Sequence, residues 1–179
     1  MHFNVNRYII TGGSGSGKSS IIKELHTRGY SCRPEISRTI IKEQQSCGGN
    51  LLPWENMEGF ADECFNRMYE QLNNKPEQLV FFDRGIPDII AYLKSRNLPV
   101  RFDYAAYASY YNSNVFICPP WPEIFINDQQ RPESFNQSKY IHQLLQEIYK
   151  DLNFKVTEVP KLSVRERAAF ILSHIKPEK

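Results

Sequence analysis

Short apolar runs alternate along this chain with segments in which apolar residues recur every three or four positions. The runs predict buried strands, and the three- and four-residue recurrence predicts amphipathic helices. No longer period repeats, so we expect one domain over residues 1–179. The strands are predicted at 8–11, about 30–33, 79–83, 115–118 and 154–159.

Turn and capping residues mark the ends of the predicted helices. Gly29 follows the first helix, where a left-handed residue commonly closes the last turn, and three prolines stand where later helices begin. A serine with a glutamine or glutamate three residues later predicts a capping box before each of the last two helices. The helices are therefore expected at 19–26, from Pro34 to 41, from near Pro53 to 72, from Pro87 to 93, from Ser134 to 152 and from Ser163 onward.

Strands and helices alternate in this way over almost the whole length. The alternation is typical of an α/β layer fold with a mostly parallel, five-stranded sheet flanked by helices. In such sheets, ligands bind outside the carboxyl ends of the strands. We therefore expect functional residues directly after the predicted strands.

Residues 12–19 match the phosphate-binding loop pattern G-x-x-x-x-G-K-[ST] at every position. They stand between the first strand and the first helix, which is the order that such a loop needs. A flexible Gly/Ser linker is the alternative, but a linker has no reason to separate an apolar strand from an apolar-faced helix. The candidate nucleotide-binding residues are Gly12, Gly13, Ser14, Gly15, Ser16, Gly17, Lys18, Ser19 and Ser20.

The residue types in this loop suit a nucleoside triphosphate and Mg²⁺. Glycines let backbone N–H groups converge on phosphate oxygens, and the helix N-terminus behind them adds partial positive charge. Lys18 can reach the β- and γ-phosphates, and the Ser19 hydroxyl can ligate Mg²⁺. Before phosphate binds, we expect the Lys18 side chain to face the solvent. ATP is the expected nucleotide, with GTP as the alternative.

Two acids and one arginine follow predicted strands. Four apolar residues lead into Asp83, as expected of the acid that organises Mg²⁺ in a phosphate-loop enzyme. Arg84 beside it fits a catalytic cation or a structural ion pair. Glu35 lies where the second strand passes into a helix. It is either a ligand-facing carboxylate at the sheet edge or a first-turn acid that complements the helix dipole.

Two later segments fit contact with substrates. Residues 92–116 are rich in aromatic side chains, which either pack into the core or form a ring-stacking pocket for an acceptor. Residues 119–135 hold four prolines together with Asp128 and Arg131. Loops of this length are usually functional or disordered. The segment is either a lid that closes over the phosphates and brings Arg131 to the transferring group, or a surface loop with a solvated charge pair.

Composition and charge narrow the class of protein. A net charge of +2 without a basic run argues against a nucleic-acid partner. The four cysteines include no C-x-x-C pair, which argues against a zinc site and fits a reducing compartment. No apolar run has the length of a membrane span, and residues 1–7 are too polar for a signal peptide. We therefore expect a cytoplasmic protein without a membrane partner.

Four segments together resemble the AAA_28 group of small phosphate-loop proteins. They are the loop at 12–19, residues 82–85, the proline-rich stretch with residues 127–131, and the closing segment 159–167. That group includes relatives of the nicotinamide-riboside kinase domain, and its topology is similar to that of nucleoside and nucleotide kinases. The resemblance implies a nucleotide-kinase-like P-loop NTPase fold that binds ATP and Mg²⁺, with a lid at about 119–135.

A resemblance to deoxynucleoside kinases implies roles for individual residues. It makes Glu35 the general base toward an acceptor hydroxyl and Arg131 the lid arginine. Asp83 and Arg84 match the acid and the arginine after the third strand. Unlike those kinases, the chain offers one arginine in the lid core instead of several. The chain also lacks room for the helical lid domain of an AAA+ motor, so a mechanical motor is not expected.

Two classes of function fit these residues. In the first, a small-molecule kinase passes the γ-phosphoryl of ATP to an acceptor hydroxyl that Glu35 or Asp83 deprotonates, with nucleosides and ribosides as candidate acceptors. In the second, the protein is an ATP- or GTP-binding regulatory module, or an NTPase without a small-molecule acceptor. The sequence lacks the [NT]-K-x-D motif with which Ras-like switches bind guanine, and this favours the kinase.

Overall fold

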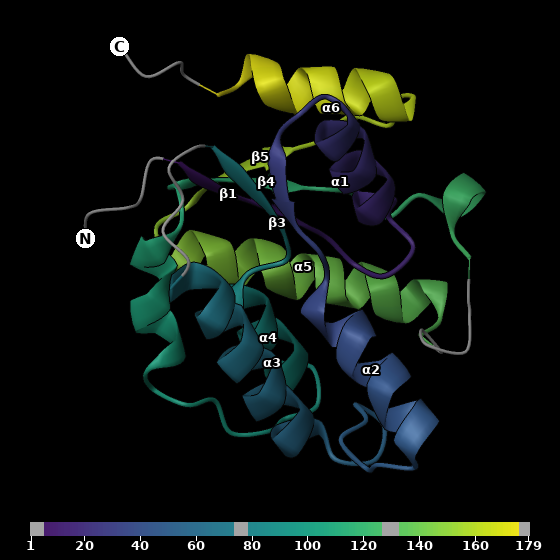
Figure 1. Cartoon of the computed structure of the whole chain (residues 1–179), viewed down its shortest axis with the longest axis vertical. Helices are drawn as coiled ribbons and strands as arrows, with labels where there is room; N and C mark the ends of the chain where they lie inside the picture. The colour runs from purple at the N-terminus through teal and green to yellow at the C-terminus, as the bar shows by residue number, and fades with distance from the viewer. Residues whose placement is uncertain (1–5, 74–78, 127–132, 176–179) are drawn as a thin grey trace.

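The computed structural model describes residues 6–73, 79–126 and 133–175. Its centre is a five-stranded sheet in the order β2-β3-β1-β4-β5, and every described strand pair is parallel (Figure 1). The α/β fold predicted from the sequence is therefore confirmed. The strands are β1 (Arg7–Thr11), β2 (Ser31–Arg33), β3 (Val80–Asp83), β4 (Asn114–Ile117) and β5 (Lys155–Glu158).

The strand register brings together residues that are far apart in the sequence. β1 lies between β3 and β4, with Ile10 opposite Asp83 in one pair and Thr11 opposite Ile117 in the other. Because the strands run in the same direction, their carboxyl ends meet at one edge of the sheet. The loop after β1, the acid that ends β3 and the segment after β4 therefore lie side by side.

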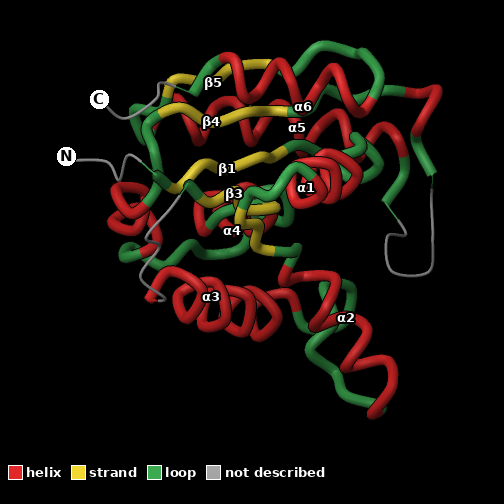
Figure 2. The backbone as a smooth tube through the Cα atoms, turned by 45° about the horizontal axis from the view of Figure 1, so that its top comes forward, coloured by secondary structure: helices red, strands yellow, loops and turns green. Residues whose placement is uncertain are grey.

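Helices cover both faces of the sheet (Figures 1 and 2). α1 and α6 pack around Ile10 and Phe81 on one face, and α3, α4 and α5 pack around Ile9 and Phe82 on the other. α2 extends away from the sheet (Figure 2). The helices are α1 (Lys18–Thr27), α2 (Ile36–Cys47), α3 (Met57–Asn73), α4 (Ile86–Lys94), α5 (Phe135–Asp151) and α6 (Val164–Ser173), with short 3-10 helices η1 (Tyr104–Tyr110) and η2 (Pro122–Ile124).

α2 begins after Glu35, whereas the sequence predicted a helix that starts at Pro34. Glu35 has extended backbone angles, φ −62° and ψ 113°, and its side chain makes no capping hydrogen bond to the helix. Glu35 is therefore not an acid inside the first helical turn. It is the N-cap residue, and its carboxylate pairs with Arg84 at the carboxyl edge of the sheet.

α3 begins at Met57, and the prediction of a start near Pro53 was wrong. The Asn56 N–H donates to the Leu52 carbonyl at 2.9 Å and closes a turn. The Asn56 side chain then accepts a hydrogen bond from a first-turn N–H of the helix at 3.0 Å, as an N-cap does. Trp54 consequently lies on the turn and not in the buried stripe of the helix, and it is 39% exposed.

The aromatic stretch 92–116 contributes mainly to the core. Tyr104 and Tyr111 are buried, and Tyr107 packs edge-on against Phe65 and Tyr69 of α3. Core packing, one of the two alternatives, therefore explains most of these rings.

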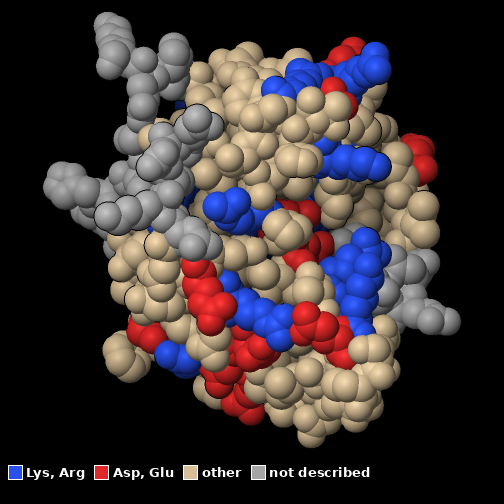
Figure 3. Space-filling view, in the orientation of Figure 1, with Lys and Arg blue, Asp and Glu red and all other residues tan. Residues whose placement is uncertain are grey.

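Charged side chains of both signs are interspersed on the face that Figure 3 shows. This agrees with the scattered basic residues of the sequence. The four cysteines are free thiols. Among residues 6–73, 79–126 and 133–175, no helix has both the length and the apolar character needed to cross a membrane.

Candidate active site

The phosphate-binding loop joins β1 to α1, as the sequence predicted. Gly17, with a φ of 81°, stands directly before α1. α5 lies against the loop, because the Ser138 hydroxyl donates to the Ser14 carbonyl at 2.7 Å. A Cβ atom at Gly13 would collide with Ser138, so a residue other than glycine would push the loop away from α5. The loop is thus held by its surroundings as well as by its own turns.

The Lys18 side chain is only 2% exposed, so the expectation that it faces the solvent is wrong. Its Nζ donates to the carbonyls of Gly12 and Gly13 at 2.9 and 2.8 Å. The ammonium group shares these buried carbonyls with two other donors, because Arg84 Nη1 also donates to Gly12 and the Ser16 hydroxyl also donates to Gly13. The cation therefore lies inside the loop and is positioned by the backbone of the loop.

Ser19 and Asp83 form the second part of the site. The Ser19 hydroxyl donates to Asp83 Oδ2 at 3.0 Å. Asp83 is 3% exposed, and its Oδ1 has no hydrogen-bond partner within the described part of the chain. Burial, and secondly the charge of Glu35, raise the pKa of Asp83 to about 6, although Lys18, Arg84 and the Ser19 hydroxyl act in the opposite direction.

These two residues fit a magnesium ion. Mg²⁺ prefers oxygen ligands and is usually held by one or two protein groups together with substrate phosphates and water. The Ser19 hydroxyl and the unpaired Asp83 Oδ1 supply oxygens at the mouth of the phosphate loop. An unpaired oxygen on a buried carboxylate costs stability, so a cation beside it would also stabilise the fold.

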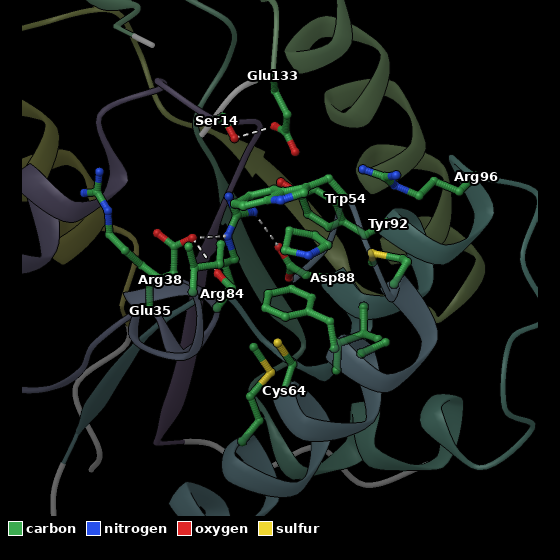
Figure 4. A pocket seen from close by; sticks show the side chains of 18 residues that line it. Ser14, Glu35, Arg38, Trp54, Cys64, Arg84, Asp88, Tyr92, Arg96 and Glu133 are labelled. Carbon is green, nitrogen blue, oxygen red and sulfur yellow. Dashed lines mark hydrogen bonds and ion pairs between the residues drawn. The ribbon is translucent and has the colours of Figure 1, made fainter. Parts of the chain in front are cut away.

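Arg84 connects the loop to Glu35. Its Nη1 donates to the Gly12 carbonyl at 3.1 Å, and its Nε donates to Glu35 Oε1 at 3.2 Å (Figure 4). The side chain is buried and also lies 5.3 Å from the centre of the Tyr92 ring. Arg84 has a φ of 73°, a left-handed conformation that is unfavourable for a residue with a side chain. The structural ion pair, one of the two alternatives for Arg84, is therefore present.

Asp88, in the first turn of α4, fixes the position of the Arg84 side chain. It accepts hydrogen bonds from the Thr11 and Tyr149 hydroxyls and from the Gly85 N–H, and it forms an ion pair with Arg84 at 3.4 Å. The carboxylate is buried with several partners, as a buried charge requires. Asp88 therefore fixes Arg84 from a rigid helix and is itself a structural residue.

A pocket opens beside the loop, between α2, α3 and α4 (Figure 4). Its empty volume is about 810 Å³, including space open to solvent. It is lined by Ser14, Glu35, Ser37, Arg38, Ile41, Pro53, Trp54, Met57, Phe60, Ala61, Cys64, Met68, Arg84, Asp88, Ile89, Tyr92, Arg96 and Glu133.

The pocket lining combines aromatic rings with charge at the rim. Trp54 and Tyr92 offer ring surfaces, and Arg38 and Arg96 lie on opposite sides of them (Figure 4). The remaining wall is apolar and includes Cys64, a buried thiol whose pKa is raised by desolvation. Acceptor contact was one of the two alternatives for the aromatic stretch 92–116, and of that stretch Tyr92 is among the lining residues. Trp54 comes from the turn before α3.

The predicted lid spans residues 119–135, and the structure describes 119–126 and 133–135 of it. These described residues contact the phosphate loop at two points. Phe125 packs so closely that a Cβ atom at Gly15 would lie 2.5 Å from its ring. Glu133 accepts a hydrogen bond from the Ser14 hydroxyl. The loop is therefore approached by this segment at two points.

Most of the predicted catalytic and metal-binding residues come together at this edge of the sheet. Ser20 lies beside them on α1 and is exposed. Arg131, the predicted lid arginine, lies outside the described residues, so its role stays a prediction. The residues that the structure brings together are Lys18, Ser19, Glu35, Asp83 and Arg84.

Several residues around the site were not predicted from the sequence. Asp88 carried a usable signal, because an acid at the third position of a helix can accept a hydrogen bond from the N–H of the N-cap residue, here Gly85. The position of Trp54 could also have been predicted, because asparagine is a favoured N-cap residue. A helix capped by Asn56 begins after Trp54, which leaves the tryptophan outside the helix. Ser138 and Arg167 contact the loop from α5 and α6, and nothing local in the sequence marks them.

The family model AAA_28, an AAA domain, matches residues 7–167. The chain belongs to the AAA_28 family. The match runs from the start of β1 into α6 and so includes the phosphate loop, the pocket and the predicted lid. No curated protein matches the sequence of this AAA_28 protein.

Several solved structures share the fold of the AAA_28 protein, among them two kinases. A deoxyadenosine kinase from M. mycoides with bound dATP aligns with a TM-score of 0.64 and 18% identity, over 93% of this chain and 97% of that one. The thymidylate kinase from Candida albicans aligns with 0.65 and 15%, over 94% and 89%. The NadR protein in complex with NR aligns with 0.67 and 14%, over 97% of this chain and 51% of NadR. At these identities the likeness shows the fold, which is that of the P-loop kinases.

Proposed function

We propose that this AAA_28 protein is an ATP- and Mg²⁺-dependent kinase that transfers the γ-phosphoryl group to a hydroxyl of a small acceptor. The observation that carries the proposal is the link through Arg84. One guanidinium joins the phosphate loop at Gly12 to Glu35 in the wall of the pocket. A regulatory nucleotide binder has no need for a carboxylate in a ring-lined pocket beside its phosphates.

The donor triphosphate binds the loop, through the backbone of residues 12–17 and the side chains of Lys18, Ser19 and Ser20. Lys18 exchanges its two loop carbonyls for phosphate oxygens. Ser19 and Asp83 hold Mg²⁺, which when bound neutralises charge on the phosphates. ATP is the proposed donor, and GTP is the alternative.

Glu35 is the proposed general base. It lines the pocket, whereas Asp83 is hydrogen-bonded to Ser19, so Glu35 is better placed to take a proton from an acceptor in the pocket. Arg84 orients Glu35 and adds positive charge near the transferring group. Arg131 is proposed to reach that group from the lid, as an arginine does in other phosphoryl-transfer enzymes.

A nucleoside or riboside is the proposed acceptor. Trp54 and Tyr92 provide faces on which a ring can stack, and ribose hydroxyls would then lie toward Glu35 and the loop. The structural neighbours named above include a deoxyadenosine kinase and a protein bound to NR, and they support this class of acceptor. The cytoplasm is the proposed location, because the four cysteines are free.

The test is an ADP-release assay with ATP, Mg²⁺ and a panel of deoxynucleosides, ribonucleosides and ribosides. We expect at least one member of the panel to stimulate ADP release about tenfold or more, with a phosphorylated product detected by mass spectrometry. Slow ATP hydrolysis that no panel member stimulates would contradict a nucleoside or riboside kinase.

The Asp83→Asn variant should be more stable than the wild type and less active. An unfolded aspartate loses its proton near its ordinary pKa of 3.8, whereas folded Asp83 retains it to about 6. Between these values the folded state holds more protons, so wild-type stability falls as pH rises. Asparagine does not titrate, so at pH 7 the variant should gain on the order of 3 kcal/mol. Thermal unfolding at pH 4 and pH 7 measures the gain, which should be smaller at pH 4.

Mg²⁺ gives this prediction a second, independent measurement. Because the cation would pair with the Asp83 carboxylate, Mg²⁺ should raise the melting temperature of the wild type more than that of Asp83→Asn. Asp151→Asn, an exposed aspartate at the end of α5, serves as the matched control and should behave like the wild type. Equal Mg²⁺ stabilisation of wild type and Asp83→Asn would remove Asp83 from the metal site.

A further inference from the structure

The pocket beside the phosphate loop differs in polarity from one end to the other. Ser14 and Glu133 lie at one end, Cys64 lies at the opposite end, and Glu35 and Arg84 lie between them (Figure 4). The lining residues around Cys64 in α3 share one face of that helix, because they recur at three- and four-residue steps. We call this face the α3 wall, and it consists of Met57, Phe60, Ala61, Cys64 and Met68.

The α3 wall offers no strong hydrogen-bonding group to a ligand. Its side chains contain neither nitrogen nor oxygen, and each of them is at most 9% exposed. The Cys64 thiol is a weak donor that stays neutral, because burial raises its pKa. The backbone in the interior of a helix hydrogen-bonds to itself. Ile41 of α2 and Ile89 of α4 extend the apolar lining.

The polar groups of the pocket lie where the phosphoryl transfer is proposed. Glu35 is the proposed base and Ser14 belongs to the phosphate loop, so the reacting hydroxyl of an acceptor lies near them. The charge of Glu35 is also one cause, after burial, of the raised pKa of Cys64, so the two side chains lie within the length of a small molecule. An acceptor that fills the pocket therefore extends from Glu35 to the α3 wall.

Burial against the α3 wall favours apolar groups and penalises polar ones. Each donor or acceptor that leaves water without gaining a partner costs about 1–3 kcal/mol. The natural nucleobases all carry such groups on their edges. A hydrocarbon ring carries none, and cavities lined by apolar side chains bind apolar molecules such as benzene. The wall therefore selects against the edge of a nucleobase.

We propose that the acceptor is a riboside with an apolar ring, and that this ring is buried against the α3 wall while a ribose hydroxyl lies beside Glu35. The inference rests on the proposed function, because it takes the pocket as the acceptor site of a kinase. It narrows the proposed acceptors to those whose ring has no hydrogen-bonding edge. In the transfer, the acceptor oxygen bonds to the γ-phosphorus, the bond from that phosphorus to the β,γ-bridging oxygen breaks, ADP leaves, and the hydroxyl proton passes to Glu35.

The experiment compares two ribosides on the full chain, with Mg²⁺ and a non-hydrolysable ATP analogue present. β-D-Ribofuranosylbenzene has the ribose of uridine and a benzene ring in place of the base. In calorimetric titrations it should bind about 5- to 150-fold more tightly than uridine, which is the effect of one unpaired polar group. With ATP in place of the analogue, kcat/KM from ADP release should show a preference in the same direction.

Substitutions at Met68 test whether the α3 wall is the source of the preference. Met68→Gln puts an amide on the wall with a side chain of similar length, and the amide can pair with the edge of uracil. This variant should lose most of the preference for the benzene riboside, whereas Met68→Leu keeps the wall apolar and should retain it. Glu70→Gln, which adds an amide to α3 at an exposed position outside the pocket, is the matched control.

Fluorescence gives a measurement that does not depend on how well Met68→Gln folds. The chain has two tryptophans, of which Trp54 lines the pocket. In Trp121→Phe, the emission therefore comes from Trp54 alone. The benzene riboside should change this emission at lower concentrations than uridine does. Emission that stays unchanged when calorimetry shows saturation would place the ring outside the pocket and overturn the inference.

The outcomes separate this inference from the proposed function. If uridine or adenosine is phosphorylated with a kcat/KM equal to or above that of the benzene riboside, the apolar ring is overturned and the kinase is retained. A folded Met68→Gln protein with the full wild-type preference would also overturn the inference. Tighter binding of the benzene riboside without a phosphorylated product would overturn the kinase but retain the apolar specificity of the pocket. A wild type that binds neither riboside contradicts both.

Discussion

Lys18→Ala is expected to lower kcat/KM for ATP by about 10²-fold or more, the loss that follows removal of one preorganised donor of transition-state charge. The Nζ of Lys18 is already inside the phosphate loop, 2.8 and 2.9 Å from the carbonyls of Gly13 and Gly12. The variant removes one donor from each carbonyl, but Arg84 still donates to Gly12 and the Ser16 hydroxyl still donates to Gly13, so we expect a stability loss of only about 1 kcal/mol.

Steady-state kinetics below the melting temperature of the variant separate the two effects, with thermal unfolding as the stability measurement. Lys23→Ala is the matched control, because Lys23 is exposed on the same helix. We expect this control to change neither turnover nor stability by a measurable amount. Wild-type turnover in a folded Lys18→Ala protein would show that the loop does not bind the transferring phosphate.

Glu35→Gln is the second large effect. Loss of a general base typically reduces turnover 10²- to 10⁴-fold, and we expect a reduction of about that size in kcat. Affinity for ATP should be nearly unchanged, because Glu35 contacts Arg84 and Ser37 and lines the pocket. Glutamine keeps an oxygen that can accept from Arg84, so the fold should be retained. Kinetics with the acceptor, together with calorimetric titration of an ATP analogue, measure the two quantities.

Two further variants sharpen this test. Ser37→Ala removes the 2.7 Å hydrogen bond to Glu35 Oε1 and should reduce kcat far less than Glu35→Gln, because it affects orientation alone. Glu147→Gln, an exposed glutamate on α5, should have no effect. If Glu35→Gln turns over at the wild-type rate, Glu35 is not the base and serves only to pair with Arg84.

The sequence predicted those parts of the site that consist of consecutive residues with a recognisable pattern. The loop at 12–19 and the apolar run ending in Asp83 each specify a local structure. The parallel sheet then brings them together, as Ser19 and Asp83 show with their 3.0 Å hydrogen bond. Local pattern and fold class were sufficient here, because strand ends in a parallel sheet share one edge.

The remaining parts depend on distances between elements, which no local pattern contains. Residues of α2, α3 and α4 line the pocket. Trp54 also lines it, because the turn closed by Leu52 and Asn56 places the tryptophan before the start of α3. The contact of Arg167 with the loop spans 151 positions along the chain. Pairings of that kind are decided by how the layers pack.

The left-handed backbone of Arg84 bears on any attempt to transplant this site into another protein. A φ of 73° at a residue with a side chain costs about 1–2 kcal/mol, and here the ion pairs with Glu35 and Asp88 offset that cost. Copying only Glu35 and Arg84 onto a host strand would let the arginine relax to an ordinary backbone conformation and point its guanidinium elsewhere. The smallest portable unit is therefore the turn from Asp83 to Gly85 together with the carboxylate of Asp88, and a design that omits the turn would carry the residues without their geometry.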